Sequence, residues 1–343
     1  MTVRGGQGER PRLEHVAARA GVSRSTASRA LGGGGYVSSR ARRAVLAAAD
    51  ELGYSPNQAA RSLVTRRTGA VALVLSEPEE RVLDDPYFAA VIRAAFRELA
   101  AVGGQLLVMF VDSAGDVPNA VRFLDGGHVD GALVFAPHRA DPLPGALGRT
   151  RLPVVFGGSP GSGSRGRDTV DFDNEAGARL AVDHLVERGR RRIATISGPA
   201  DHAAGIARLA GWRAAVAAHR AGDAELVEEG DFTLAGGERA MRRLLDRRPD
   251  LDAVFAASDP TAAGALRALR AAGRRVPEDV AVVGFDDHPT LAPALSPPLT
   301  SVHQDPRDQV REMVAMLRRL RDGARIRARH RILPVSLVRR ESA

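Results

Sequence analysis

A short segment near the amino terminus carries side chains that could read a nucleic acid. In residues 23–31 the apolar side chains recur at helical spacing and are expected to point inward. The side chains left facing outward are Arg24, Ser25, Ser28 and Arg29. An exposed arginine can donate two hydrogen bonds to guanine O6 and N7, or it can bind phosphate. For Arg29 the two roles are equally open, whereas Ser25 is too short to specify much alone.

The elements on either side of this segment complete a helix-turn-helix pattern. Residues 13–20 have an apolar face at helical spacing, and Gly21 can adopt the positive φ of a sharp turn. Ser23 is a suitable N-cap for the helix that follows. A third amphipathic helix is predicted for residues 39–52. This pattern is typical of proteins that read the major groove, although an ordinary three-helix bundle without a ligand would also fit it.

The charge distribution favours contact between this head and DNA. All 49 basic residues are arginine, and the net charge is +8. Residues 1–68 hold 12 arginines and 4 acidic residues, whereas the remaining chain has 37 of each and is neutral. A basic head on a neutral body suggests a head that meets phosphate, and a merely solvated basic tail is the alternative.

From residue 68 onward, apolar strands alternate with amphipathic helices, which predicts parallel sheets. The clearest strands are 70–75, 105–111, 131–135, 153–156, 192–196, 253–256 and 280–285. The clearest helices are 87–102, 174–188, 208–220, 236–247 and 260–272. Because these units exceed one compact sheet, we predict two lobes, with the Gly/Ser-rich run 157–166 as a surface loop between them.

Polar and aromatic residues gather where these strands end. Ser258 and Asp286 each follow a predicted strand, Phe232 follows another, Arg208 opens a helix, and Gln304 lies in a crossover. Ligands of open α/β sheets bind at the carboxyl ends of strands, so these residues are candidates for a binding site. Each also has a structural explanation: a helix cap for Asp286, a surface ion pair for Arg208 and core packing for Phe232.

Several segments resemble the LacI/GalR family of bacterial regulators. They are residues 13–31, Val37-Ser38, the run VLAAADELGYSPN at 45–57 and ARSL at 60–63, and the resemblance runs through essentially the whole chain. It implies an α/β protein in which an all-α helix-turn-helix head is joined by a hinge helix to a two-lobed, periplasmic-binding-protein-like (type I) domain with parallel sheets. The DNA-binding residues it implies are Ser23, Arg24, Ser25, Thr26, Ser28, Arg29, Asn57, Ala60, Arg61 and Leu63.

In this family the short segment after Pro56 forms a hinge helix on DNA. A helix of this length is marginal in water, so we expect it to depend on DNA and on its dimer mate. The resemblance implies that Leu63 is wedged between central base pairs, an apolar insertion that kinks DNA. A plain linker between domains is the alternative.

The resemblance also implies a small-molecule effector, a sugar or sugar derivative, bound between the lobes. Arg208 and Asp286 would hold its hydroxyls, Phe232 would stack on its ring, and Tyr87 or Phe88 would cover the side of the other lobe. The stretch 77–85 is longer and more acidic than the usual approach to this aromatic pair. The effector-binding residues we predict are Tyr87, Phe88, Asp112, Arg208, Phe232, Ser258, Asp286 and Gln304.

The predicted domain bounds follow from these assignments. We expect a disordered N-terminus at 1–11, the helix-turn-helix domain at 12–56, the hinge at 57–68 and the effector domain at 69–343. Within the effector domain, lobe 1 would comprise about 69–167 and 303–333, and lobe 2 about 168–302 and 334–343. The resemblance places the three crossings between the lobes near Thr169, Ser301 and Pro334.

Other classes of protein have little support in the sequence. The chain has no cysteine, no apolar run of membrane-span length, and no apolar segment of a signal peptide in its first twelve residues. A dehydrogenase would need a dinucleotide fingerprint and a phosphate loop would need a lysine, and neither is present. A sugar-transport receptor would share the body but not residues 1–68. We therefore expect a cytoplasmic, homodimeric repressor without enzymatic activity, cofactor, metal or membrane contact, whose partners are double-stranded operator DNA and a carbohydrate.

Overall fold

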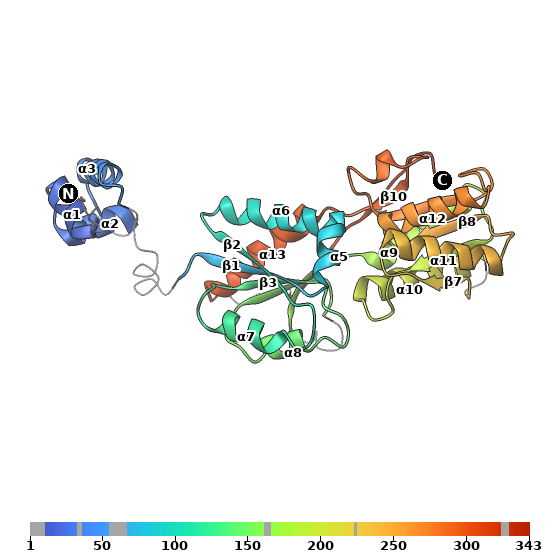
Figure 1. Ribbon diagram of the computed structural model, residues 1–343, viewed down its shortest axis with the longest axis horizontal. Helices are drawn as coiled ribbons and strands as arrows, with labels where there is room; N and C mark the ends of the chain where they lie inside the picture. Colours follow the sequence, from blue (N-terminus) through green and yellow to red (C-terminus); the bar gives the residue numbers. More distant parts are fainter. Residues whose placement is uncertain (1–10, 33–35, 55–66, 161–165, 223–224, 324–328) are drawn as a thin grey trace, which may run out of the picture. The chain divides into compact units, whose positions relative to one another are not determined.

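The computed structural model describes residues 11–32, 36–54, 67–160, 166–222, 225–323 and 329–343 (Figure 1). The chain divides into two compact units, Met1–Thr68 and Gly69–Ala343. The sequence predicts an all-α head for the first unit and parallel sheets for the second. Both expectations of fold class are confirmed.

In residues 11–32 and 36–54 the first unit forms a bundle of three helices. They are α1 (Leu13–Ala20), α2 (Arg24–Gly32) and α3 (Ser39–Glu51). Val16, Ala27 and Val45, one from each helix, are buried against one another in its core. Gly21 ends α1 with φ of 63°, which is the left-handed conformation that the sharp turn requires.

The second unit contains two six-stranded sheets, one in each lobe. The sheet of lobe 1 has the order β11-β5-β4-β3-β1-β2, and all its strand pairs are parallel. Its strands are β1 (Ala70–Leu75), β2 (Gln105–Phe110), β3 (Ala132–Phe135), β4 (Val154–Gly157), β5 (Asp168–Phe172) and β11 (His330–Leu333). Its helices are α5 (Glu79–Asp84), α6 (Pro86–Ala100), α7 (Val117–Asp125), α8 (Pro142–Leu147) and α13 (Pro306–Arg321).

The sheet of lobe 2 has the order β12-β10-β9-β8-β6-β7, and only β12 is antiparallel to its neighbour. Its strands are β6 (Ile193–Ser197), β7 (Val227–Glu229), β8 (Ala253–Ala256), β9 (Ala281–Asp286), β10 (Thr300–His303) and β12 (Ser336–Val338). Its helices are α9 (Asn174–Glu187), α10 (Ala203–His219), α11 (Leu234–Arg247) and α12 (Asp259–Ala271), with a short 3-10 turn at Ala292–Ala294.

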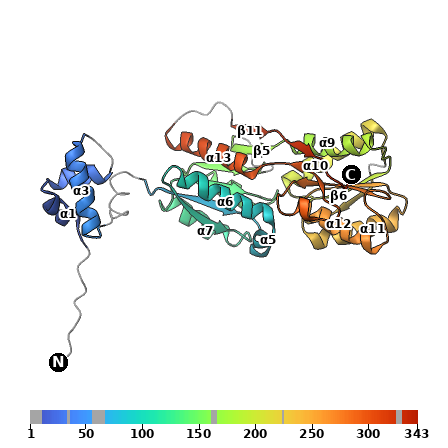
Figure 2. The same ribbon diagram turned by 90° about the horizontal axis from the view of Figure 1, so that it is seen from above.

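Helices cover both faces of each sheet (Figures 1 and 2). In β1, Val71, Leu73 and Leu75 pack with α6 and α13, whereas Ala72 and Val74 pack with the helices α7 and α8 on the opposite face. Successive side chains of a strand point to opposite faces, so a strand buried on both faces must be apolar throughout. That is why β1 reads as the continuous apolar run AVALVL.

Two sequence-based expectations about the boundary between the lobes are wrong. Thr169 lies within β5, which pairs with β4 and β11 in lobe 1, so the first crossing comes after Phe172. The run 157–166 connects β4 to β5 in the same sheet, so it is not a loop between lobes. The other two crossings follow β10 and β11, at residues 304–305 and 334–335. Strand pairing decides these points, and the local sequence carries no sign of it.

Helices α11 and α12 pack at two glycines that allow close approach. A Cβ atom at Gly264 would lie 2.1 Å from the carbonyl oxygen of Leu234, and one at Gly237 would lie 2.2 Å from that of Thr261. We expect Gly264→Ala to lower the free energy of unfolding by about 1–3 kcal/mol, because backbone atoms on the facing helix must shift. Urea denaturation followed by circular dichroism and by the fluorescence of Trp212, the single tryptophan, measures this change.

Gly145 provides the matched control for this prediction. It also lies in a helix, α8, but no heavy atom lies within 4 Å of the place where its Cβ would stand. Gly145→Ala should therefore leave stability unchanged or raise it by up to about 1 kcal/mol. Equal destabilisation by both substitutions would show that close helix approach is not what Gly264 provides.

Candidate functional site

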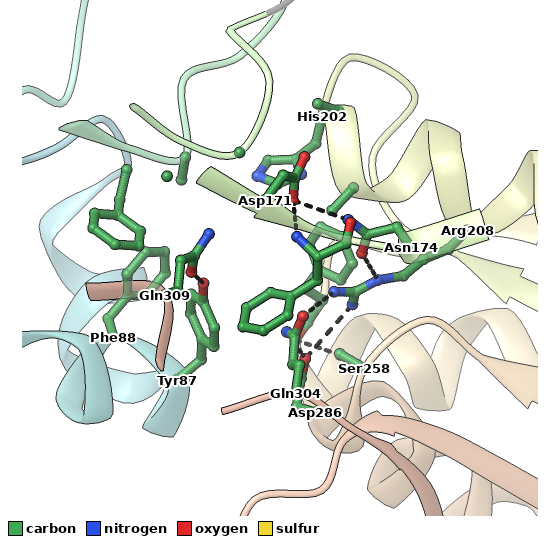
Figure 3. A pocket seen from close by; sticks show the side chains of 18 of the residues that line it. Tyr87, Phe88, Asp171, Asn174, His202, Arg208, Ser258, Asp286, Gln304 and Gln309 are labelled. Atoms are coloured by element: carbon green, nitrogen blue, oxygen red, sulfur yellow. Dashed lines mark hydrogen bonds and ion pairs between the residues drawn. The ribbon is translucent and has the colours of Figure 1, made fainter. Parts of the chain in front are cut away.

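A pocket of about 700 Å³, partly open to solvent, lies between the two lobes of the second unit. Its lining comes from the carboxyl ends of β3, β4 and β5 and the start of α6 in lobe 1, and from the segments after β6, β7, β8 and β9 in lobe 2 (Figure 3). Seven of the eight predicted effector-binding residues line this pocket. They are Tyr87, Phe88, Arg208, Phe232, Ser258, Asp286 and Gln304.

The buried Arg208 is the centre of a polar network in the pocket. Its Nε donates to Asn174 Oδ1 at 2.8 Å, and its Nη1 donates to the carbonyl oxygen of Ala257 at 2.6 Å. The same Nη1 lies 3.6 Å from Asp286 Oδ1. Arg208 lies in the second turn of α10, which begins at Ala203 and thus five residues before the predicted start. A guanidinium with these fixed partners is pre-oriented and holds the groups around it in place.

Asp286, the last residue of β9, completes the network on the side of lobe 2. Its Oδ1 accepts a hydrogen bond of 2.7 Å from Gln304 Nε2. Burial raises the pKa of the Asp286 carboxyl well above its ordinary value, and the neighbouring Arg208 guanidinium opposes that rise. Asp286 has φ of 109° and Phe232 has φ of 62°, both rare for residues with a side chain. Backbone strain of this kind persists where the surroundings fix a site.

Aromatic side chains form the apolar walls of the pocket. Phe232 packs edge-on against His202, with 5.3 Å between ring centroids, and Tyr87 packs edge-on against Phe88 at 5.5 Å. The Tyr87 hydroxyl donates to Gln309 Oε1 at 3.1 Å. Burial, and then the nearby Asp286, raise the pKa of Tyr87, so its hydroxyl stays protonated at any physiological pH. The arrangement offers apolar faces with hydrogen-bonding groups at their edges, which suits a polar ring.

Sequence reasoning missed seven polar residues that line this pocket. Asp85 caps α6 by accepting a hydrogen bond from the Tyr87 amide at 2.9 Å, and Asp171 accepts one of 3.1 Å from Asn174 Nδ2. Gln309 fixes Tyr87 through the bond already described and donates to the carbonyl oxygen of Val170 at 2.8 Å. Asp85 and Asp171 could have been found as carboxylates at a helix start and a strand end. The remaining missed residues are Arg81, Ser159, Asn174 and His202.

Asp112, the eighth predicted residue, does not reach the pocket. It is exposed and follows β2, which is the edge strand of its sheet. The pocket lies over β3, β4 and β5, so the carboxyl end of an edge strand lies too far along the sheet to line it. Ser258 lines the pocket, but its Oγ also caps α12 by accepting from the Thr261 amide at 3.3 Å. This cap is a structural role that the sequence alone did not separate from binding.

The predicted DNA-reading residues of the first unit lie on α2 and at its cap. Arg24, Ser25, Ser28 and Arg29 are exposed. The Arg24 Nε pairs with Glu14 Oε1 at 2.8 Å, and the two side chains are 72% and 53% exposed. Such an exposed pair is weak, so Arg24 can exchange Glu14 for another partner at little cost.

The hydroxyls at the start of α2 are engaged in capping. Ser23 Oγ accepts from the Thr26 amide at 3.2 Å and lies 2.9 Å from both the Ser25 and the Thr26 hydroxyls. Thr26 is half-buried, so it faces outward less than its neighbours. The other predicted DNA-binding residues, Asn57, Ala60, Arg61 and Leu63, lie outside the residues that the structure describes.

The residues that the structure describes were searched for metal-binding groups and for membrane-spanning helices. No group of three or more His, Cys, Asp or Glu side chains in that part of the chain is placed to hold a metal ion. In the same residues, no helix is long and apolar enough to cross a membrane.

Comparisons with known proteins agree with this architecture. The model of bacterial regulatory proteins of the lacI family matches residues 12–57, and that of the periplasmic binding protein-like domain matches residues 182–343. The HTH-type transcriptional regulator CelR of Thermobifida fusca is 49% identical over 310 residues, which cover 90% of this chain and 91% of that protein. The ribose operon repressor of Escherichia coli strain K12 is 34% identical over 88% of this chain and 90% of its own length.

Solved structures show the same likeness. A complex of the transcriptional regulator CelR with cellobiose matches with a TM-score of 0.77 and 45% identity, over 97% of this chain and all of that one. The Lac repressor dimer bound to operator and the anti-inducer ONPF matches with a TM-score of 0.85 and 29% identity, over 97% of this chain and 99% of that one. By their names, these relatives are transcriptional regulators and repressors. The chain therefore belongs to the lacI family of bacterial regulatory proteins, and it is a DNA-binding transcriptional regulator with a small-molecule sensor domain.

Proposed function

We propose that this regulator is a homodimeric repressor whose affinity for its operator is changed by a neutral sugar, with cellobiose as the first candidate. The observation that carries the proposal is the pocket between the lobes, where the Arg208–Asp286–Gln304 network lies beside the ring of Phe232. The choice of sugar comes from the likeness of the whole chain to a structure of CelR in complex with cellobiose. As a regulator of genes, the protein would act in the cytoplasm.

The charges in the pocket favour a neutral sugar over an acidic one. Three carboxylates line it, those of Asp85, Asp171 and Asp286, and burial raises the pKa of each. Its two guanidinium groups already have anionic partners, because Arg208 lies beside Asp286 and Arg81 pairs with Glu77. An acidic sugar would add a buried negative charge without a free cation to meet it, which is costly.

The test is a titration of the operator in the presence and absence of sugar. Full-length protein is mixed with fluorescent operator DNA, and binding is followed by anisotropy with cellobiose, ribose or cellobionate added. We expect cellobiose alone to change operator affinity, by roughly 5–150-fold, and to raise the melting temperature of the protein. A response to cellobionate but not to cellobiose would contradict the choice of a neutral sugar, and a failure to bind any DNA would contradict the assignment as a repressor.

The resemblance at residues 60–63 leads to a prediction about DNA bending. If Leu63 is wedged between the central base pairs, Leu63→Ala should reduce the bend and lower operator affinity, because the apolar wedge that unstacks the bases is lost. Sugar binding should be unchanged. The bend angle is measured by energy transfer between dyes at the two ends of an operator fragment, with wild-type protein as the reference. A bend of the same size with the variant would remove the intercalation hypothesis.

A further inference from the structure

A second set of contacts joins the lobes at the segments that follow β3 and β6. His138 of lobe 1 lies after β3, and its Nδ1 is 2.9 Å from Asp201 Oδ2 of lobe 2. The amide of Arg139 donates to the carbonyl oxygen of Asp201 at 2.8 Å, and His138 forms an isolated antiparallel bridge with His202. These contacts are made by loops other than the three segments in which the chain crosses between the lobes, and they are present with the lobes closed against each other.

On the side of lobe 1, His138 is held by a buried carboxylate. Glu77 is 2% exposed, and its Oε1 lies 3.3 Å from His138 Nε2 and 2.9 Å from Arg81 Nη1. Arg81 extends from α5, the helix formed by the long acidic stretch that precedes α6. Its guanidinium carbon lies 5.2 Å from the centroid of the Phe232 ring in lobe 2. A guanidinium at this distance from a ring face is attracted by the ring electrons.

We propose that Glu77, Arg81 and His138 form a latch that closes on Asp201 and Phe232 and so sets how tightly the lobes hold the effector. The proposal rests on the assignment of the pocket as the effector site. Arg81 and Phe232 both line that pocket, so the latch and the bound effector share side chains. Three crossings of the chain connect the lobes covalently. The latch adds side-chain contacts between the lobes, from His138 to Asp201 and from Arg81 to Phe232.

Protonation of His138 controls the strength of the latch. The nearby Glu77, and then Asp201, raise the pKa of His138 to about 9, although partial burial opposes the rise. The other charged and titratable groups that face this histidine are Arg81 and His202. Burial, and then the positive charge of Arg81, lower the pKa of His202 to about 3. His138 is therefore the group that titrates here between pH 7 and 10.

When the lobes open, His138 loses its contact with lobe 2 and keeps those within lobe 1, and this difference sets the sign of the pH dependence. Glu77 and Arg81 belong to the same lobe as His138 and stay with it, whereas Asp201 is lost. The pKa of His138 is thus higher in the closed state, and its protonation favours closure. That contribution is present at neutral pH and is lost as the pH rises through about 9. Asp201 is 55% exposed, so solvent screening keeps the effect modest.

A double-mutant cycle tests the latch in the full-length protein. Cellobiose affinity is measured by calorimetry at pH 7.5 for wild type, His138→Gln, Asp201→Asn and the double variant. Each single change should weaken binding by about two- to fivefold, and the double variant should bind no more weakly than either single one, because the same contact is lost. The wild-type affinity should fall by a similar factor between pH 7 and 10, and that of His138→Gln should not.

The pair His219 and Asp183 is a matched control. Its Nε2–Oδ1 distance is 2.6 Å, but both residues belong to helices of lobe 2, so the pair does not cross between lobes. His219→Gln and Asp183→Asn should leave cellobiose affinity unchanged. Equal weakening by the latch pair and the control pair would overturn the proposal, and so would full additivity in the cycle.

Hydrogen exchange in the free protein separates the latch from the choice of effector. If the latch exists, the segments 138–142 and 199–203 should exchange faster in His138→Gln than in wild type or His219→Gln, with no sugar present. Absence of cellobiose binding in every version would overturn the proposed effector only. Unchanged exchange in these segments would overturn the latch, whether or not cellobiose binds.

Discussion

Replacing Asp286 with alanine is expected to abolish the response to cellobiose and to leave operator affinity without sugar nearly unchanged. The substitution removes the carboxylate beside Arg208 and the acceptor that holds Gln304 Nε2 at 2.7 Å. Asp286 lines the pocket and lies 3.6 Å from Arg208 Nη1, and truncating one partner of a buried charge pair in a binding site costs about 2–5 kcal/mol, so cellobiose affinity should fall by roughly 30-fold or more. Arg208 keeps its bonds to Asn174 and Ala257, so lobe 2 should still fold.

Operator titrations of wild type and variant, each with and without cellobiose, measure this effect. Asp112→Ala is the matched control, because Asp112 is also an aspartate that follows a strand, but it is exposed and outside the pocket. It should respond to sugar as wild type does. If Asp286→Ala lowers the melting temperature strongly, Asp286→Asn retains the shape and should still lose most of the response. A full response by both Asp286 variants would mean that the effector binds elsewhere.

Replacing Arg24 with alanine is expected to relax the operator preference at one base pair in each half-site. A bidentate contact between arginine and guanine discriminates against the wrong base by about 1–3 kcal/mol. Among the residues that the structure describes, Arg24 pairs with the exposed Glu14, so little stability should be lost when the side chain is removed. A dimer carries two such contacts, so the loss at a symmetric operator should be about twice that for one half-site.

Binding to a library of operators with single base changes measures this specificity. Arg29→Ala provides the comparison, because Arg29 is also exposed on α2 and its Nε donates to the carbonyl oxygen of Ser25 at 3.3 Å. If Arg29 binds phosphate, its loss lowers the affinity for all operator sequences alike. It also reduces the slope of log affinity against log salt concentration by about one. Uniform weakening by Arg24→Ala as well would show that Arg24 also binds phosphate and reads no base.

Much of the fold could be predicted because its signals are local. The helices of the head follow from apolar spacing, a glycine at the turn and a serine cap, and the structure has Gly21 and Ser23 in those roles. Strands buried on both faces must be apolar throughout, so β1 and β9 were recognisable. Helix α5 was not predicted, because a six-residue acidic helix has too few apolar positions to show a period.

The candidate site was predicted only in part, because neighbours in a sheet need not be neighbours in sequence. Arg208 and Asp286 could be selected as charged residues near strand ends, and they line one pocket. Asp112 satisfied the same local criterion and is outside the pocket, because β2 lies at the edge of its sheet. Gln309 gave no signal at all, since its position in α13 became meaningful only when that helix packed on lobe 1.

The sequence by itself implied the class of protein through its resemblance to a known family. It also determined the charge of the head and the alternation of strands and helices, because composition and short-range spacing encode these two properties directly. Only the tertiary structure decided which strands share a sheet, where the chain crosses between lobes, and that Glu77, His138 and Asp201 meet. These three residues are separated by more than 60 positions at each step, and no local pattern records such a contact. It arises from the order of strands in two sheets and from the closure of one lobe on the other.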